Sequence, residues 1–386
     1  MKICAIICEF NPFHNGHKYL LDTARKLSGC DALLCIMSGN FTQRGEICIL
    51  DKFSRAKHAV LGGADCVIQL PTYFATAPAE IFAEGAVKIL ASIPDVCTVA
   101  FGCESGKAQN FLEAAKILNE ESQAFKSTLI KRLNEGESYI KSVAAAFEAC
   151  GGNKGFIESP NNILGVEYAK AVLKLKPDIK LLPIERVGAG YNDEKIIENY
   201  SSASAIRQNL DSPLLKNNVP VFVFEDLKNA RLAEEAFGNI QRYAIVSGGK
   251  ERLSMTAGCS EGLENKLYSL SGLPDKNIIK EATGKRYSAS RIRRILTCNA
   301  LGLYEKDCKK FLNGELYIKP LAVKQCAKDD ILTALTRSIF PLIIRQRDLA
   351  NLSEKAKECF KKDILESKVW GIANGKTNYD FTLLTI

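Results

Sequence analysis

The chain has 386 residues, of which 46% are hydrophobic and 25% charged, with a formal net charge of +8. This composition excludes a largely disordered chain, and the length allows two domains. No apolar stretch approaches the roughly 18 residues of a membrane-spanning helix, and the N-terminus lacks a signal-peptide pattern. We therefore expect a cytoplasmic protein with no membrane partner.

The first half alternates short apolar segments with amphipathic ones. Residues 2–10, 32–37, 66–70, 96–101 and 180–183 are apolar and too short for typical helices, so they predict strands. Helical spacing of apolar residues begins at residue 17 and recurs over 52–61, 77–92, 107–149, 161–174 and 203–210. This alternation predicts an α/β fold with a parallel sheet covered by helices on both faces. Ligands bind beyond the carboxyl ends of the strands in such sheets.

A break at residues 211–218, which contain Asp-Ser-Pro and Asn-Asn, divides the chain into predicted domains 1–210 and 211–386. Short predicted helices over 224–236, 252–255, 261–270, 276–283 and 291–298 make the second domain mainly α-helical. Residues 1–210 contain 23 Lys and Arg residues and 23 Asp and Glu residues. The second domain therefore contains 52 − 23 = 29 basic residues and 44 − 23 = 21 acidic residues. The net positive charge therefore lies in the second domain and suggests a polyanionic partner.

The 14 cysteines are scattered and form no Cys-x-x-Cys pair. Because we expect no secretion, this spacing argues against a disulfide framework and against a zinc site, and we predict no metal-binding residues. A Walker A loop is also absent, which excludes a P-loop nucleotide site.

Two of the three histidines, His14 and His17, stand where the first predicted strand gives way to the first predicted helix. A helix N-terminus offers N–H groups and the positive end of its dipole to an anion. Gly16 between them suits close approach of a phosphate to the backbone. The pair therefore indicates a nucleotide site. A capping or packing role and half of a metal site are the alternatives, although the nearest thiol, Cys8, falls inside the predicted strand.

The segment EFNPFHNGHKYLL at residues 9–21 contains a His-x-Gly-His core and resembles the signature of the HIGH-type nucleotidyltransferase superfamily. With MSGNFTQRGE at residues 37–46, it is most similar to the bacterial tRNA(Met) cytidine acetate ligases. That family makes N4-acetylcytidine at the wobble position of elongator methionine tRNA. The resemblance implies a Rossmann-like nucleotidyltransferase domain over 1–210, followed by a helical, basic, tRNA-binding domain over 211–386.

By this resemblance His14 and His17 are the catalytic residues, and the whole first turn contributes to the ATP site. That turn comprises Ile7, Cys8, Glu9, Phe10, Asn11, Pro12, Phe13, His14, Asn15, Gly16, His17, Lys18, Tyr19 and Leu20. Gly102, Asn161 and Arg186 are carried over in the same way. A plain turn glycine is the alternative for Gly102, and a one-residue shift would exchange Asn161 for Asn162, with a simple helix cap as a further alternative.

A second phosphate-binding element is expected near the end of the first domain. The KMSKS loop of the synthetases is missing, whereas residues 202–207 (SASAIR) are similar to the Ser-Ser-Thr-x-x-Arg segment of cofactor adenylyltransferases. Ala203 departs from the usual second serine. The resemblance implies that Ser202, Ser204 and Arg207 bind the β- and γ-phosphates of ATP. The alternative is an ordinary helix cap followed by a surface arginine.

Two further polar segments are candidates for the other substrates. Gln43 and Arg44, in the loop 38–46, could face a carboxylate such as acetate or the RNA, or could simply be solvated. Residues 285–294 (KRYSASRIRR) hold five cations and no acid, with Tyr287 able to stack on a base. This second segment predicts RNA contacts, with a solvated basic face as the alternative; its cations are Lys285, Arg286, Arg291, Arg293 and Arg294.

The resemblance thus implies a ligase that activates acetate as acetyl-adenylate and acetylates N4 of the tRNA cytidine. ATP is then a substrate, Mg²⁺ is expected to accompany it, and no protein partner is implied. Two other functions stay open. One is a cofactor adenylyltransferase acting on phosphopantetheine or nicotinamide mononucleotide, and the other is a non-catalytic tRNA-binding protein.

Overall fold

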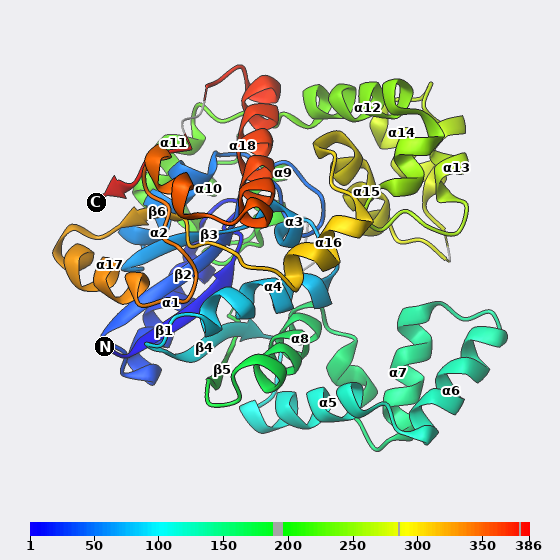
Figure 1. The fold of residues 1–386 in the computed structure, drawn as a ribbon, viewed down its shortest axis with the longest axis horizontal. Helices are drawn as coiled ribbons and strands as arrows, with labels where there is room; N and C mark the ends of the chain where they lie inside the picture. Colours follow the sequence, from blue (N-terminus) through cyan, green and yellow to red (C-terminus); the bar gives the residue numbers. More distant parts are fainter. Residues whose placement is uncertain (188–195, 285, 378–379) are drawn as a thin grey trace.

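The computed structural model describes residues 1–187, 196–284, 286–377 and 380–386 and contains a seven-stranded sheet, on the left in Figure 1, from which helices extend to the right. The strand order is β5-β4-β1-β2-β3-β6-β7. Strands β1 to β5 are parallel, β6 runs antiparallel to β3, and β7 is parallel to β6. The strands are β1 Ile3–Cys8, β2 Ala32–Ser38, β3 Cys66–Leu70, β4 Val96–Cys103, β5 Lys180–Glu185, β6 Pro320–Val323 and β7 Leu384–Thr385.

The predicted α/β fold with a parallel sheet is confirmed. Strands β6 and β7 were not predicted, because they have only four and two residues and β6 begins with a proline. Both come from beyond residue 211, so the sheet continues across the predicted domain boundary. The assignment of 1–210 to ATP and 211–386 to tRNA stays a prediction.

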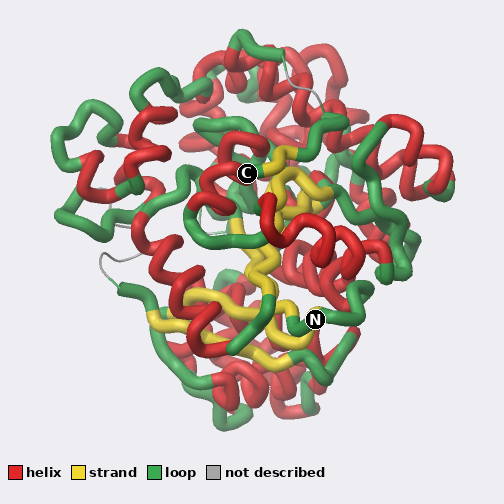
Figure 2. Tube along the Cα trace, turned by 90° about the vertical axis from the view of Figure 1, so that its left-hand side faces the viewer, coloured by secondary structure: helices red, strands yellow, loops and turns green. Residues whose placement is uncertain are grey.

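Helices cover both faces of the sheet, as Figure 2 shows from the side. Alternate residues of β1 explain this arrangement, because Ile3, Ala5 and Ile7 join one hydrophobic cluster and Cys4, Ile6 and Cys8 join another. Helices α4, α5 and α8 contribute to the first cluster, and α1 and α2 to the second. These helices are α1 Asn15–Ser28, α2 Lys52–Leu61, α4 Ala79–Ala91, α5 Ala108–Glu120 and α8 Pro160–Leu175.

The long helical region predicted over 107–149 is three helices, α5, α6 (Gln123–Asn134) and α7 (Tyr139–Ala149). Ser122 caps the start of α6 by accepting a hydrogen bond from Phe125 N, and Gly136 has a φ of +83° just after the end of α6. This half also contains two short α-helices, α3 Thr72–Ala75 and α9 Ala203–Gln208, and a 3-10 helix at Lys154–Ile157; α10 Leu215–Asn218 follows just beyond the predicted boundary.

The second half is mainly helical, as predicted. Helices α12 to α15 enclose a separate hydrophobic cluster that includes Ile245, Leu267 and Ile292. The single helix predicted over 224–236 is wrong, because residues 228–233 interrupt it between α11 and α12. None of the described helices combines the length and apolarity needed to cross a membrane. The helices are α11 Val221–Leu227, α12 Glu234–Met255, α13 Leu263–Ser269, α14 Asp275–Ala282, α15 Ala289–Leu301, α16 Glu305–Leu312, α17 Lys328–Thr336 and α18 Glu354–Asn374.

A buried ionic cluster joins α18 to the loop that follows β2. Lys52 Nζ lies 2.7 Å from Asp380 and 3.3 Å from Glu366, and the side chains of Lys52 and Glu366 are at most 1% exposed. Glu366 also accepts a hydrogen bond from Asn40 N at 2.7 Å. Nearby, Trp370 Nε1 donates to the Cys48 carbonyl at 2.7 Å. The C-terminal helix therefore fixes residues 39–52, at the same end of the sheet as the site described below.

Replacing Lys52 with Met would leave two buried carboxylates without their cation. We expect the free energy of unfolding to fall by about 3–5 kcal/mol. Urea denaturation measures it. The matched control is Lys276→Met, whose exposed pair with Glu234 at 3.8 Å should contribute less than about 1 kcal/mol. Equal effects of the two substitutions would contradict the role of the buried cluster.

Candidate functional site

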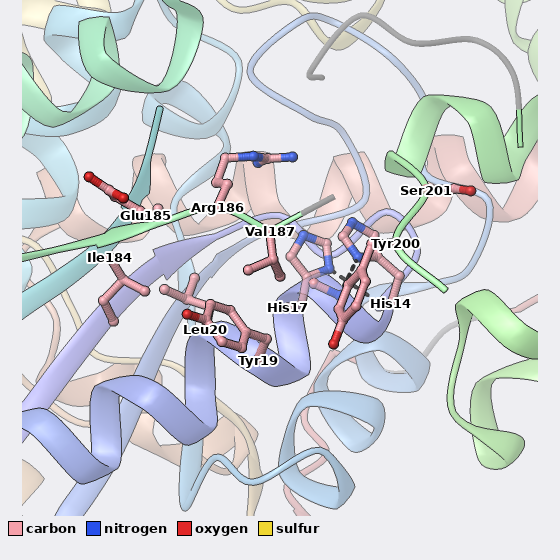
Figure 3. Close-up of a pocket in the computed structure, with 12 residues that line it drawn as sticks. His14, His17, Tyr19, Leu20, Ile184, Glu185, Arg186, Val187, Tyr200 and Ser201 are labelled. Atoms are coloured by element: carbon pink, nitrogen blue, oxygen red, sulfur yellow. Dashed lines mark hydrogen bonds between the residues drawn. The ribbon is translucent and has the colours of Figure 1, made fainter. Parts of the chain in front are cut away.

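A half-open pocket lies at the carboxyl ends of β1, β4 and β5, which are neighbours in the sheet (Figure 3). The cavity meets the start of α1, the end of β4 and the segment that follows β5. Its lining residues are His14, Gly16, His17, Tyr19, Leu20, Gly102, Ile184, Glu185, Arg186, Val187, Tyr200 and Ser201.

The two histidines form the N-terminal cap of α1 through their side chains. His14 Nδ1 accepts a hydrogen bond from Gly16 N at 3.1 Å, and His17 Nδ1 accepts from His14 N at 3.3 Å. The rings are stacked with centroids 3.6 Å apart. Because Nδ1 is an acceptor in both neutral rings, the proton of each ring resides on Nε2. The cap thus leaves each histidine with an Nε2–H donor.

Burial keeps both imidazoles neutral. It lowers the pKa of His14 to about 3, and the positive charge of Arg186 adds to the effect. The pKa of His17 is likewise well below its usual range, through burial and the neighbouring His14 and Arg186. Phe10 packs against His17 with centroids 4.8 Å apart. A φ of +49° at Phe10, unusual for an aromatic residue, turns the chain between β1 and these rings.

The first turn divides into residues that line the cavity and residues that support it. His14, Gly16, His17, Tyr19 and Leu20 line it. Four others, Ile7, Cys8, Phe10 and Phe13, are buried in the two main clusters. Of the remaining predicted residues, Glu9, Asn11, Asn15 and Lys18 make hydrogen bonds or ion pairs with other parts of the protein. The peptide bond between Asn11 and Pro12 is cis.

Three polar members of that set have partners of their own. Asn15 Nδ2 donates to the carbonyls of Asn199 and Asn217 at 3.1 and 2.7 Å, so it holds the segment that carries Tyr200 and Ser201. Lys18 forms an exposed ion pair with Asp22 at 2.9 Å. Glu9 accepts from Gln43 N at 2.6 Å, and burial raises the pKa of its carboxyl group.

Gly102 and Arg186, two further residues predicted to bind ATP, also line the pocket. A Cβ at Gly102 would come within 3.4 Å of the Arg186 side chain, an ordinary contact, so the glycine is not required by that neighbour. Asn161 lies at the start of α8, where its N and Nδ2 donate to Glu104 Oε1 at 3.1 and 2.7 Å. Asn162 is fully buried and its Oδ1 accepts from Glu104 N, so Asn161 is the more accessible of the two.

The predicted second phosphate element begins α9. Ser202 Oγ accepts from Ala205 N as the N-cap, and Ser204 Oγ lies 3.4 Å from Arg207 Nη2. Arg207 Nη1 donates to the Asn11 carbonyl at 2.6 Å, and Nη2 lies 2.7 Å from Glu46. Arg207 thus connects α9 to the first turn and to the loop after β2.

That loop also contacts the predicted RNA-binding segment. The Gly45 carbonyl accepts a hydrogen bond from Thr297 Oγ1 at 2.8 Å, and Glu46 lies 3.8 Å from Arg293. Gln43 donates through Nε2 to the Ala77 carbonyl at 2.9 Å, so its amide is engaged within the protein. Arg44 is partly buried in the same loop.

The cations of the RNA-binding prediction differ in exposure. Lys285 lies outside the described residues. Arg286 pairs with Glu261 at 3.4 Å and is largely exposed, and Arg291 lies over the Tyr287 ring at 5.1 Å from its centroid. Burial lowers the pKa of Arg294, whereas the Arg293 side chain is 37% exposed. The segment therefore offers three accessible cations among its described residues, and a fourth that packs inward.

Comparison with known proteins identifies the family. The model of the HIGH nucleotidyl transferase family matches residues 1–382. A tRNA(Met) cytidine acetate ligase of Caldanaerobacter subterraneus is 34% identical, with 97% of this chain and 96% of that protein covered. One from Clostridium botulinum is 39% identical over 81% of each chain. The chain belongs to the tRNA(Met) cytidine acetate ligase family.

Solved structures agree with this membership. The chain is similar to Thermotoga maritima TmcAL in its apo form, with a TM-score of 0.93 and 28% identity over the whole of both chains. TmcAL bound with alpha-thio ATP gives a TM-score of 0.89 at 27% identity, again over both whole chains. This chain is therefore an enzyme of the ligase family, and its fold is that of TmcAL.

Five of the residues that line the pocket of this acetate ligase family member were not predicted from the sequence. Ile184, Glu185 and Val187 line the cavity at the end of β5, and Tyr200 and Ser201 line it just before the SASAIR segment. Glu46 was not singled out either, although it follows Gln43 and Arg44. Their positions in the sequence could have indicated them, because these residues directly adjoin the end of a predicted strand or a predicted phosphate-binding segment.

The neutral state of the histidines can be measured, since this ligase family member has only three. Burial disfavours the charged form, so we expect the His14 and His17 imidazole resonances to stay constant between pH 5 and 8. The pKa of His58 should also lie below its ordinary value. NMR of the free protein, with assignment by single His→Gln variants, tests this. Titration of His14 or His17 near pH 6.5 would contradict the buried, mutually capped arrangement.

Proposed function

We propose that this chain activates acetate with ATP and transfers the acetyl group to N4 of the wobble cytidine of elongator methionine tRNA. In the first step an acetate oxygen attacks the α-phosphate, and pyrophosphate leaves. In the second step the N4 amine attacks the acetyl carbonyl carbon, the mixed anhydride bond breaks, AMP leaves and the amine loses a proton. Membership of the family supports the overall reaction, and the cavity supports the adenylation step.

The observation that carries the proposal is the pair of neutral histidines at the helix start. Their Nε2–H groups and the N-terminus of α1 converge on one cavity with Arg186. Preorganised donors of this kind stabilise charge that develops on phosphate oxygens without reorganisation. Because the rings are neutral, they act as hydrogen-bond donors rather than as general acids. His14 and His17 are therefore the proposed catalytic residues.

ATP binding is proposed to extend along the carboxyl ends of the strands. Gly102 and Arg186 would border the nucleoside and α-phosphate, with Asn161 beyond them at the start of α8. Ser202, Ser204 and Arg207 would meet the β- and γ-phosphates, through hydroxyl groups and a guanidinium. The rest of the Ile7–Leu20 turn would act mainly by support, since its buried members hold the histidines in place.

Mg²⁺ is proposed to arrive with ATP. Within the described residues no group of three or more His, Cys, Asp or Glu side chains is arranged to hold a metal ion. The donor set therefore fits an ion that is bound chiefly by phosphate oxygens and water, as Mg²⁺ commonly is. When bound, it would neutralise phosphate charge. The residues above would still orient the nucleotide.

The tRNA is proposed to lie along the start of α15. Arg286, Arg291 and Arg293 offer accessible guanidinium groups there, and Tyr287 offers a ring for stacking. Lys285 and Arg294 complete the proposed set. The Gly45–Thr297 hydrogen bond places this helix against the loop after β2, and that loop reaches the ATP site through Glu46. Such a surface would bind RNA in a salt-dependent manner.

His14→Asn is the sharpest test of the site, because Asn is a good N-cap but is too short to present a donor where Nε2 lies. We expect kcat for acetate-dependent pyrophosphate release to fall by about 10²–10³-fold. Thermal unfolding should change little. The control is Lys26→Ala, an exposed residue in the last turn of the same helix. Full activity of His14→Asn would show that the site is wrongly assigned.

The same assay separates the alternatives. An acetate ligase consumes ATP in proportion to tRNA acetylated and requires acetate. A cofactor adenylyltransferase would release pyrophosphate with phosphopantetheine or nicotinamide mononucleotide and ignore acetate. A non-catalytic tRNA-binding protein would retain RNA and release no pyrophosphate in any mixture.

A further inference from the structure

We propose that Glu46 couples the two substrate sites, so that the triphosphate of ATP and the tRNA backbone compete through one shared carboxylate. This inference rests on the proposed function, since it assigns Arg207 to ATP phosphates and Arg293 to RNA phosphates. It adds an order to the reaction, in which tRNA binds more tightly after pyrophosphate has left. Glu46 acts here as a positioning residue.

Glu46 is placed between two arginines from different parts of the chain. Arg207 Nη2 from α9 lies 2.7 Å from Glu46 Oε2, and Arg293 Nη1 from α15 lies 3.8 Å from Oε1. The Arg207 side chain is 13% exposed and the Arg293 side chain 37% exposed, so one faces inward and the other reaches solvent. One negative charge is therefore divided between a cation of the ATP site and a cation of the RNA surface.

The turn that carries Glu46 is rigid, which keeps the carboxylate between them. Thr42 N donates to the Glu46 carbonyl at 2.9 Å, and Glu46 N donates back to Thr42 Oγ1 at 3.2 Å. Gly45 has a φ of +76°, and a Cβ there would lie 2.6 Å from the backbone of Arg293 and Arg294. The turn thus packs directly on α15, and Glu46 has little freedom to follow either arginine.

The competition follows from charge. When the β- and γ-phosphates attract Arg207, Glu46 loses its closer partner, and its full charge then acts on Arg293. Arg293 becomes less available to an RNA phosphate. Once pyrophosphate has left, acetyl-adenylate retains only the α-phosphate, Arg207 returns to Glu46, and Arg293 is released for RNA. By linkage, tRNA must weaken triphosphate binding by the same factor.

The expected size of the effect is modest. A partly exposed ion pair such as Glu46–Arg293 is typically worth up to about 1 kcal/mol, which corresponds to roughly a five-fold change in affinity. We therefore expect the triphosphate to weaken tRNA binding by roughly two- to five-fold relative to a monophosphate. A change of this size would bias the order of binding without preventing release of either substrate.

The test measures the Kd of an elongator methionine tRNA transcript at fixed ionic strength with saturating α,β-methylene-ATP or with saturating AMP. The methylene analogue resists cleavage at the α-phosphate and keeps the β- and γ-phosphates, whereas AMP lacks them. The ratio of the two Kd values should be about two to five for the wild type and about one for Glu46→Gln and Arg293→Gln. Glu261→Gln is the matched control, since Glu261 pairs with Arg286 on the same surface and makes no ion pair with Arg207 among the described residues.

The possible results distinguish failure of the coupling through Glu46 from failure of the proposed function. A ratio near one in the wild type, or the wild-type ratio in Glu46→Gln, overturns the coupling while ATP and tRNA binding still stand. Failure of the wild type to bind either ligand overturns the proposed function and the coupling with it. A variant that merely lost stability would weaken binding in both mixtures and leave the ratio unchanged, which would also count against the proposal.

Discussion

The cap of α1 is the interaction on which the rest of the site depends. Helices usually begin with a hydroxyl, amide or carboxylate cap, whereas here His14 Nδ1 accepts from Gly16 N and His17 Nδ1 accepts from His14 N. This exchange fixes the tautomer of both rings and directs a donor at each Nε2 away from the cap. Burial keeps both rings uncharged, and Phe10 and Phe13 pack against the ring of His17. A polar cap has thus been turned into a pair of hydrogen-bond donors at the positive end of a helix dipole.

The cap is held by parts of the chain that lie far from it in sequence. Arg207 binds the Asn11 carbonyl from the end of the first predicted domain, and Asn15 holds the Tyr200 segment. Glu366 and Trp370 of the C-terminal helix fix the loop after β2, from which Glu46 reaches Arg207. Helix α18, together with strand β6 in the sheet, therefore binds the second half of the chain to the first, and α18 does so at the end of the sheet where the pocket lies. This arrangement provides a short path from the proposed RNA surface to the proposed ATP site.

Much of the candidate site could be predicted, because the sequence signals for its position in the fold are local. The apolar strand, the His14-x-Gly-His17 turn and the SASAIR segment each carry their signal within a few residues, and the carboxyl ends of neighbouring parallel strands must meet. The predicted helix limits for residues 52–61 and the strand limits for 66–70 agree with α2 and β3. The sequence left open whether Asn161 or Asn162 contacts the nucleotide. Asn162 is fully buried, so Asn161 is the more accessible of the two.

The remaining features depend on long-range pairing that periodicity does not encode. Strand β6 joins the sheet only because β3 offers it an edge, and α18 buries charged residues, Asp363 and Glu366, that would read as solvent-exposed in an isolated helix. The proposed role of Glu46 likewise depends on its ion pairs with Arg207 and Arg293, which are 161 and 247 residues away in the sequence. The burial of Arg294 was not visible in a run of cations, because it depends on the packing of α15 against the rest of the molecule.

The most direct test of the central claim is mass spectrometry of tRNA nucleosides after incubation with this protein, ATP and isotope-labelled acetate. The account predicts N4-acetylcytidine that carries the acetate label, formed in elongator methionine tRNA and dependent on ATP. It also predicts that the label is lost with His14→Asn. Absence of labelled acetylcytidine, with tRNA and ATP both bound, would contradict the proposed reaction.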